Sequence, residues 1–139
     1  MPQVSFSQRQ DNLSYTPVWA SSGTQPAIGN GILSGSYIEQ GDLLICQIRM
    51  LIVSTTTFGT GIYTWSIPPG YTMLFPMHGV ASVFDTSAGT VFGGIARLNS
   101  GTTIAIINTS NGAFWTSTAP ITWADGDDMG VTVPVLISN

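Results

Sequence analysis

The stretch from residue 43 to residue 53 constrains the fold more than any other part of the chain, because it alternates between two faces. Its even positions are all apolar, namely Leu44, Cys46, Ile48, Met50 and Ile52. Its odd positions combine apolar side chains with Gln47 and Arg49. Successive side chains of a β-strand point to opposite faces of a sheet. We therefore expect a long strand whose even face lies in a core and whose odd face is covered only in part.

Further segments with strand character follow at intervals of about 8 to 12 residues, the spacing typical of sandwiches and barrels. Each is bounded by glycine, proline or asparagine, and they span residues 31–38, 61–70, 79–85, 89–101, 102–112, 111–120 and 128–137. The 16 glycines and 8 prolines interrupt nearly every window in which a helical period could develop. We expect an all-β fold, an antiparallel β-sandwich of about eight strands with almost no helix.

The alternation in three of these segments predicts a single core. The residues expected to share its inward face are Leu44, Cys46, Ile48, Tyr63, Trp65, Val131 and Val133. Cys46 is the only cysteine, and we interpret it as a small buried apolar residue rather than a reactive thiol. Pro134 has no backbone N–H, so the last strand is expected to lie at a sheet edge or to contain a bulge.

Charge is scarce in this chain, and its balance is acidic. Only 7% of the 139 residues are charged, and three arginines face seven acidic residues, which gives a net charge of −4. Nucleic acid is an unfavourable partner for such a chain, because no basic stripe is present to neutralise phosphates. No apolar run reaches the roughly 20 residues needed to cross a bilayer, and residues 1–10 lack the apolar core of a signal peptide. We expect a protein made in a cytoplasm, with no nucleic-acid or membrane partner.

The first 14 residues differ in character from the rest of the chain. We interpret residues 1–14 as an extended N-terminal arm and residues 15–139 as the β-sandwich domain. The candidate docking residues of the arm are Val4, Phe6, Arg9 and Leu13. A segment this short forms no core of its own, so we expect it to become ordered against another protein surface. Residues 16–31 are rich in turn-forming residues and are expected to form a long loop or an arm that crosses the domain.

Several apolar residues are predicted to point away from the core. In residues 31–38 the inward set is Leu33, Gly35 and Tyr37, which leaves Ile32 and Ile38 outward. The candidate oligomer interface therefore consists of Ile32, Ile38, Leu43 and Leu51. An exposed apolar patch without lysine at its edges is a liability unless a partner covers it. We expect the chain to cover it with copies of itself.

Catalytic patterns are missing from the sequence. The single histidine, His78, has no G-x-S-x-G serine elbow to accompany it, so a catalytic triad has no support. Glycoside hydrolysis needs two carboxyl groups at a fixed separation. Glu39 is the only glutamate, and Asp42 and Asp85 are among the carboxylates that could form such a pair with it. We expect no enzymatic activity, no catalytic residue and no cofactor.

The densest group of carboxylates is Asp125, Asp127 and Asp128, in the stretch WADGDDMG. Three carboxylates within four residues could hold calcium through hard oxygen ligands. Asp-Gly is also turn chemistry, and the order of acidic residues typical of an EF-hand is absent. We favour a turn that leads into the last strand, and we expect no metal site.

A second candidate site lies around the turn NTSNG at residues 108–112. Asn108, Asn111 and Trp115 form a candidate ligand loop, in which an aromatic ring beside amide groups could stack on a sugar. Phe114 precedes Trp115, and in a strand only one of two adjacent side chains points outward. Core packing is the alternative interpretation for both rings.

Five short segments occur in a characteristic order: YTPVW at 15–19, GNGILSGSY at 29–37, GDLLICQIRM at 41–50, TTTFGTGIYTWSIP at 55–68 and APITWADGD at 119–127. Their order and spacing resemble a group of bacteriophage virion proteins, which occur as small standalone proteins and as terminal domains of tail fibres or minor tail proteins. The resemblance covers most of residues 15–133. It implies a jelly-roll-like sandwich that forms a homotrimer, has no enzymatic activity and assembles on a virus particle.

Two roles agree with this resemblance. In a capsid decoration protein, the arm would lie on the major capsid protein or another virion protein, and the sandwich would protrude from the head surface. In a receptor-binding tail-fibre or tail-tip module, loops at one end of the sandwich would hold a host surface glycan. A fibre normally needs a shaft or an anchoring domain, for which 139 residues leave no room. We therefore expect a decoration protein, made in the bacterial cytoplasm and located on the virion.

Overall fold

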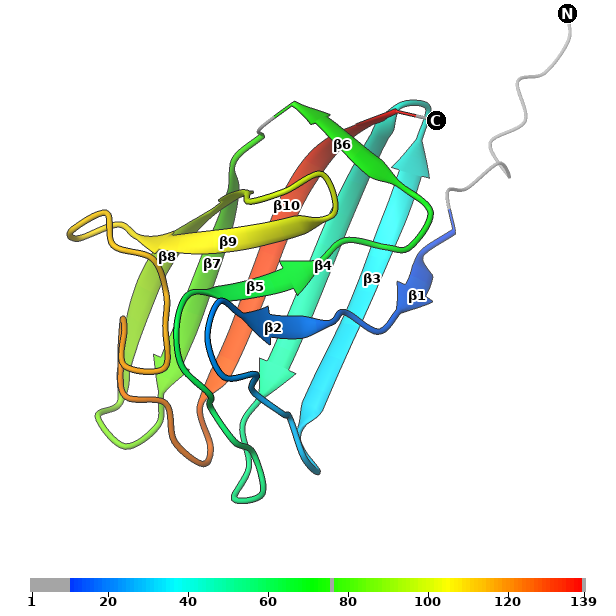
Figure 1. The fold of residues 1–139 in the computed structure, drawn as a ribbon. Helices are drawn as coiled ribbons and strands as arrows, with labels where there is room; N and C mark the ends of the chain where they lie inside the picture. Colours follow the sequence, from blue (N-terminus) through cyan, green and yellow to red (C-terminus); the bar gives the residue numbers. More distant parts are fainter. Residues whose placement is uncertain (1–10, 76, 139) are drawn as a thin grey trace, which may run out of the picture.

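The structure is a computed structural model that describes residues 11–75 and 77–138 (Figure 1). All of its regular elements are β-strands, and these residues contain no helix that could cross a membrane. The strands are β1 (Leu13–Tyr15), β2 (Trp19–Ser21), β3 (Ile32–Gln40), β4 (Leu43–Leu51), β5 (Tyr63–Ser66), β6 (Thr72–Phe75), β7 (Gly79–Asp85), β8 (Thr90–Leu98), β9 (Thr103–Asn108) and β10 (Asp128–Ser138). The predicted all-β class is confirmed. There are ten strands in place of about eight, because β1, β2 and β6 are too short to show an alternation in the sequence.

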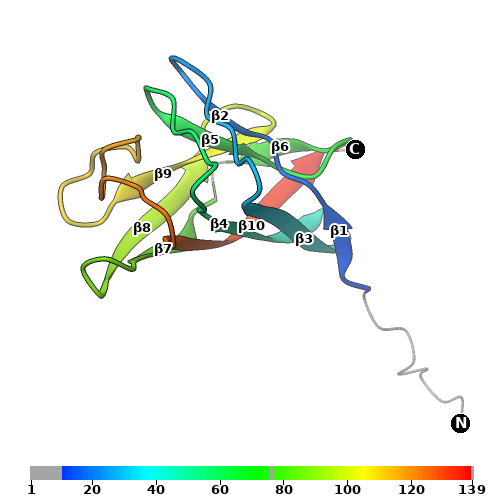
Figure 2. The same ribbon diagram turned by 90° about the horizontal axis from the view of Figure 1, so that it is seen from below.

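The strands form one antiparallel sheet that curls back on itself. Their order is β1-β3-β4-β10-β7-β8-β9-β5-β2, and β6 pairs with β10 beside this path. Figure 1 shows β9, β5 and β2 lying steeply across β3, β4 and β10, and Figure 2 shows the two layers from below. We call β3, β4, β10, β7 and β8 the main layer, and β9, β5 and β2 the cover layer. The predicted antiparallel sandwich is therefore two layers of one curled sheet, and the jelly-roll arrangement stays a prediction.

The core fills the space between the main layer and the cover layer. Each of the seven predicted core residues is at most 3% exposed, which confirms the predicted strand register. Burial raises the pKa of the Cys46 thiol to about 12, so this side chain stays protonated and packs as an apolar group. Five aromatic residues occupy the centre, with ring centroids 5.0 to 6.0 Å apart in edge-to-face contacts: Trp19, Tyr63, Trp65, Trp115 and Trp123.

Residues 111–120 do not form the predicted strand and make only isolated bridges to their neighbours. Trp115 inserts between β9 and β5. Its backbone N–H donates to the Ile106 carbonyl (2.7 Å), and its backbone carbonyl accepts from the Tyr63 N–H (3.0 Å). Gly94 on β8 makes room for the indole, because a Cβ at that position would lie 2.7 Å from the Trp115 ring. The segment is a loop that plugs the core, so its aromatic residues gave a false strand signal.

The last strand, β10, lies in the middle of the main layer, so the edge alternative is wrong, whereas the alternative of a local irregularity agrees with the register shift between Leu136 and Ile137. Its pairing with β7 ends at Thr132, and its pairing with β6 begins at Leu136, followed by a register shift before Ile137. The Asp127 carbonyl accepts from the Ile52 N–H, which lies next to β4. Backbone groups of successive strand residues point to opposite neighbours, so those of the even-numbered residues of β10, Pro134 among them, point away from β4. Pro134 thus lies in the gap between two partner strands, where its missing N–H breaks no ladder.

Candidate functional site

The main layer turns its second face, which we call the outer face, toward solvent. Strand register aligns the residues of this face in three rows that cross β3, β4, β10, β7 and β8 in turn. The central row consists of Ser34, Arg49, Gly130, Ser82 and Gly93. One flanking row consists of Ile32, Leu51, Asp128, Phe84 and Val91. The other consists of Ser36, Gln47, Thr132, Val80 and Ile95.

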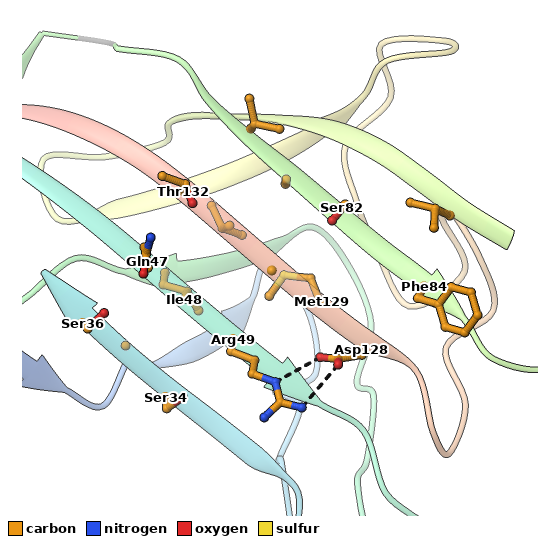
Figure 3. Close-up of a pocket in the computed structure, with 16 residues that line it drawn as sticks. Ser34, Ser36, Gln47, Ile48, Arg49, Ser82, Phe84, Asp128, Met129 and Thr132 are labelled. Atoms are coloured by element: carbon orange, nitrogen blue, oxygen red, sulfur yellow. Dashed lines mark hydrogen bonds and ion pairs between the residues drawn. The ribbon is translucent and has the colours of Figure 1, made fainter. Parts of the chain in front are cut away.

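The small residues of the central row leave a hollow of about 680 Å³ in the outer face (Figure 3). It extends from Ser34 on β3 to Val91 on β8. Gly130 lies in its middle, where a Cβ would meet no other atom within 4 Å. A hollow of this volume has the size of a ligand-binding cleft, but it is open to solvent rather than enclosed.

One ion pair lies at the hollow. The Arg49 Nε and Nη2 atoms donate to the two Asp128 carboxylate oxygens at 3.4 and 3.3 Å, as Figure 3 shows. The two side chains are 53% and 42% exposed, so the pair adds little to stability. It holds the guanidinium toward Asp128 and leaves the three rows with no net charge. Each group keeps hydrogen-bonding capacity for a further partner.

Five uncharged polar side chains around the hollow make no side-chain hydrogen bond within the described part of the chain. This applies to Ser34, Ser36, Gln47, Ser82 and Thr132. Serine and threonine side chains in the loops behave differently. Thr56, for example, donates to the Ile28 carbonyl at 2.7 Å, and Thr86 donates to the Gly126 carbonyl. The polar groups of the outer face are therefore available to a molecule that enters the hollow.

Apolar side chains gather at the other end of the outer face, on β7 and β8. Among residues 11–74 and 77–138, the structure exposes eight large apolar side chains, and five of them belong to the flanking rows. Val80 and Val91 are 72% and 62% exposed, with Phe84 and Ile95 beside them. These four were not singled out from the sequence. The available signal was that residues 79–85 carry apolar side chains on both strand faces.

The four predicted interface residues all lie on the outer side of β3 and β4, but in two separate places. Ile32 pairs with Leu51 in a flanking row at one end of the hairpin. Ile38 pairs with Ile45 near the other end, with Leu43 close by. Polar residues of the rows separate the two places. A partner that covered all four would therefore cover the hollow as well.

The candidate docking arm falls mainly outside the described residues, which is where Val4, Phe6 and Arg9 lie. Leu13 is described, is 43% exposed and opens β1, where it pairs with Tyr37 of β3. The last two residues of the predicted arm are therefore part of the sheet.

The candidate ligand loop is not assembled as predicted. Trp115 is 0% exposed, so the prediction that it contacts a ligand is wrong. Asn108 is buried too, whereas Asn111 is exposed and its carboxamide oxygen accepts from the Ala113 N–H (3.0 Å). Core packing, the alternative interpretation of the ring, is the correct one.

The acidic residues have local structural roles. Asp127 is buried and accepts from the Thr86 and Ala124 N–H groups at 3.0 and 2.7 Å, so it fixes the turn before β10, as predicted. Asp128 pairs with Arg49. Glu39 accepts from the Tyr71 hydroxyl at 2.7 Å, and this hydrogen bond raises the tyrosine pKa. His78 is exposed, and the described residues contain no cluster of three metal-binding side chains.

Comparisons with protein-family models, with curated proteins and with solved structures gave no significant match to this chain. The outer face is thus the candidate site on geometry alone, and what it offers chemically is non-covalent binding.

Proposed function

We propose that this chain is a non-enzymatic structural protein of a bacteriophage particle, most simply a capsid decoration protein that assembles as a homotrimer through its outer face. The observation that carries the proposal is the concentration of exposed apolar side chains on one side of the main layer. Burying such side chains against another subunit stabilises an assembly by about 25 cal/mol per Å² of apolar area. The proposed location on a virion rests on the sequence resemblance.

The composition of the outer face supports an interface rather than a solvated surface. Its three rows contain one arginine and one aspartate, which neutralise each other, and no lysine. Protein interfaces are depleted of charge at their centres and enriched in aromatic residues and arginine. The alternative role as a glycan-binding module loses Trp115 as a stacking ring, since this side chain is buried.

Sedimentation velocity tests the assembly. We expect the full chain to sediment as a trimer rather than as a 14.7 kDa monomer. Val80→Asp places a charge in the outer face and should weaken association at least about tenfold, because it forfeits the burial of a valine side chain. Val18→Asp is the matched control, since Val18 is 64% exposed but lies beside β5 in the cover layer. A monomer at micromolar concentration, or equal effects of both substitutions, would contradict the proposal.

Labelling of virus particles tests the proposed role in capsid decoration. If the chain decorates a capsid, immunogold electron microscopy of virions from the strain that encodes it should label the head surface. Label confined to the tail tip would replace decoration with receptor binding. Particles without label or peptide would reject a virion role.

A further inference from the structure

We infer that the hollow of the outer face is occupied by residues 1–10 of a neighbouring copy, which lie across the strands of the main layer. This inference rests on the proposed self-assembly and names the contact that would produce it. Three observations carry it: the extent of the hollow across the strands, the order of polarity along it and the direction in which β1 begins.

The hollow, which we also call the trough, spans all five strands of the main layer. It reaches from β3 to β8, four strand spacings of about 4.8 Å, or roughly 19 Å. Ten extended residues span up to about 33 Å, which is ample. The backbone groups of internal strands are already paired, so the guest cannot add as another strand. The unpartnered side chains of Ser34, Ser36, Gln47, Ser82 and Thr132 are there to bond its backbone instead.

The trough changes from polar to apolar along its length, and the segment does the same. Its β3 and β4 end carries serine, glutamine and arginine side chains, and its β7 and β8 end carries valine and phenylalanine. Read backward from residue 10, the segment begins with Gln10, Arg9 and Gln8 and then reaches Phe6 and Val4. Phe6 follows about 10 Å beyond Arg9 in an extended chain, and β7 lies about 10 Å beyond β4.

A notch at the apolar end suits an aromatic ring. Ser82 and Gly93 are paired across β7 and β8, and small side chains border the backbone there, that of Ser82 and that of Thr109, which donates to the Gly93 carbonyl at 3.3 Å. Four apolar side chains surround them in the flanking rows: Val80, Phe84, Val91 and Ile95. Phe6 is the largest apolar residue of the segment and would fill this notch.

Charge favours association of this segment with another copy in general, but it does not select the hollow, where Arg49 and Asp128 neutralise each other. Arg9 is the only charged side chain of residues 1–10, while the rest of the chain contains two arginines and seven acidic residues, a net charge of −5. A cationic segment is therefore attracted to the body of another copy, and the attraction is strongest at low salt.

The direction of β1 favours a neighbouring copy over the same copy. Tyr15 pairs with Gly35 and Leu13 with Tyr37, so the chain before Leu13 heads toward the Gln40 end of β3. That direction leads away from Ser34 and the trough. Reaching the trough of the same copy would need a reversal, whereas a neighbour can accept the segment as it leaves.

Cysteine cross-linking between different full-length chains tests the inference. Ser5→Cys places a thiol next to Phe6, and Ser82→Cys places one in the notch, while native Cys46 stays buried and protonated. When the two variants are mixed and treated with a short bismaleimide, we expect a covalent dimer. A mixture of Ser5→Cys with Val18→Cys, whose thiol would lie on the cover layer, should give none. Adding Gly130→Val to the Ser82→Cys chain fills the trough and should abolish the cross-link, although the site has room for a side chain in the folded monomer.

The outcomes separate this inference from the proposed function. A trimer in sedimentation without the Ser5–Ser82 cross-link overturns the inference and leaves the assembly standing. A monomer overturns both. A cross-link only within a chain carrying both cysteines shows that the segment folds onto its own copy and overturns the exchange. Binding of a neutral oligosaccharide that Gly130→Val removes, with no cross-link, assigns the trough to a glycan instead.

Discussion

The inner and outer faces of the main layer are carried by the same strands, yet they differ in side-chain size and in what they contact. On the inner face of β4, the residues Leu44, Cys46, Ile48 and Met50 are at most 3% exposed. On the outer face of the same strand, Gln47 and Arg49 border an open hollow. The two faces share one backbone, so side chains alone make the difference. The inner face keeps the chain folded, and the outer face is available for binding.

Removing one inner side chain should have the largest effect. Ile48→Ala should lower the free energy of unfolding by about 2 to 5 kcal/mol, because it removes buried apolar atoms and leaves a cavity. Its outer-face control is Gln47→Ala, which should change stability by less than about 0.5 kcal/mol. Urea unfolding followed by tryptophan fluorescence measures both. Equal losses would mean that the outer face is packed as tightly as the inner one.

Two glycines of the main layer sharpen the comparison. Gly94→Ala should cost about 1 to 3 kcal/mol by overpacking, because its Cβ would lie 2.5 Å from Ile106 and 2.7 Å from Trp115. Gly130→Ala should instead stabilise by about 0.5 kcal/mol, since a strand glycine gains a side chain in open space. Thermal unfolding monitored by circular dichroism should show opposite shifts. A loss at Gly130 would show that the outer face has no room in the monomer.

Raising the pH should lower the free energy of unfolding through Cys46, a residue of the inner face. The pKa of Cys46 is raised by burial to about 12 in the folded chain, against an ordinary value of 9.0. Between these two values the unfolded chain releases the thiol proton and the folded chain does not, so stability falls as pH rises through this window. At pH 10 the loss due to this group should be on the order of 1 kcal/mol. A Cys46→Ala variant should lose less stability between pH 8 and pH 10, and an identical pH profile would contradict the assignment.

The smallest effect is expected at the outer ion pair. Arg49→Met removes the bonds to Asp128, but both side chains are about half exposed, so the free energy of unfolding should change by less than about 1 kcal/mol. The same substitution should not alter the Ile48 cavity effect, because the two side chains lie on opposite faces. A double-mutant cycle with Ile48→Ala checks this independence.

The inner face was predictable, because period-2 alternation depends only on local sequence. Leu44, Trp65 and Val133 could be placed in one core without knowing which strands were neighbours. The outer site could not be found in this way. Ser34, Arg49, Gly130 and Ser82 come from four different strands and form a row only through strand register. Trp115 shows the opposite failure, since a loop that plugs a core has the same local pattern as a strand.

The sequence by itself determined the all-β class, the inward residues and the scarcity of charge, because each of these follows from composition and from alternation along a strand. Tertiary structure alone decided that β10 lies between β4 and β7, that the sheet curls into two layers and that small residues meet in a hollow. The physical reason is that strand pairing joins residues far apart in the chain. Side-chain alternation tells which way a residue points, and only the register of neighbouring strands tells what stands beside it.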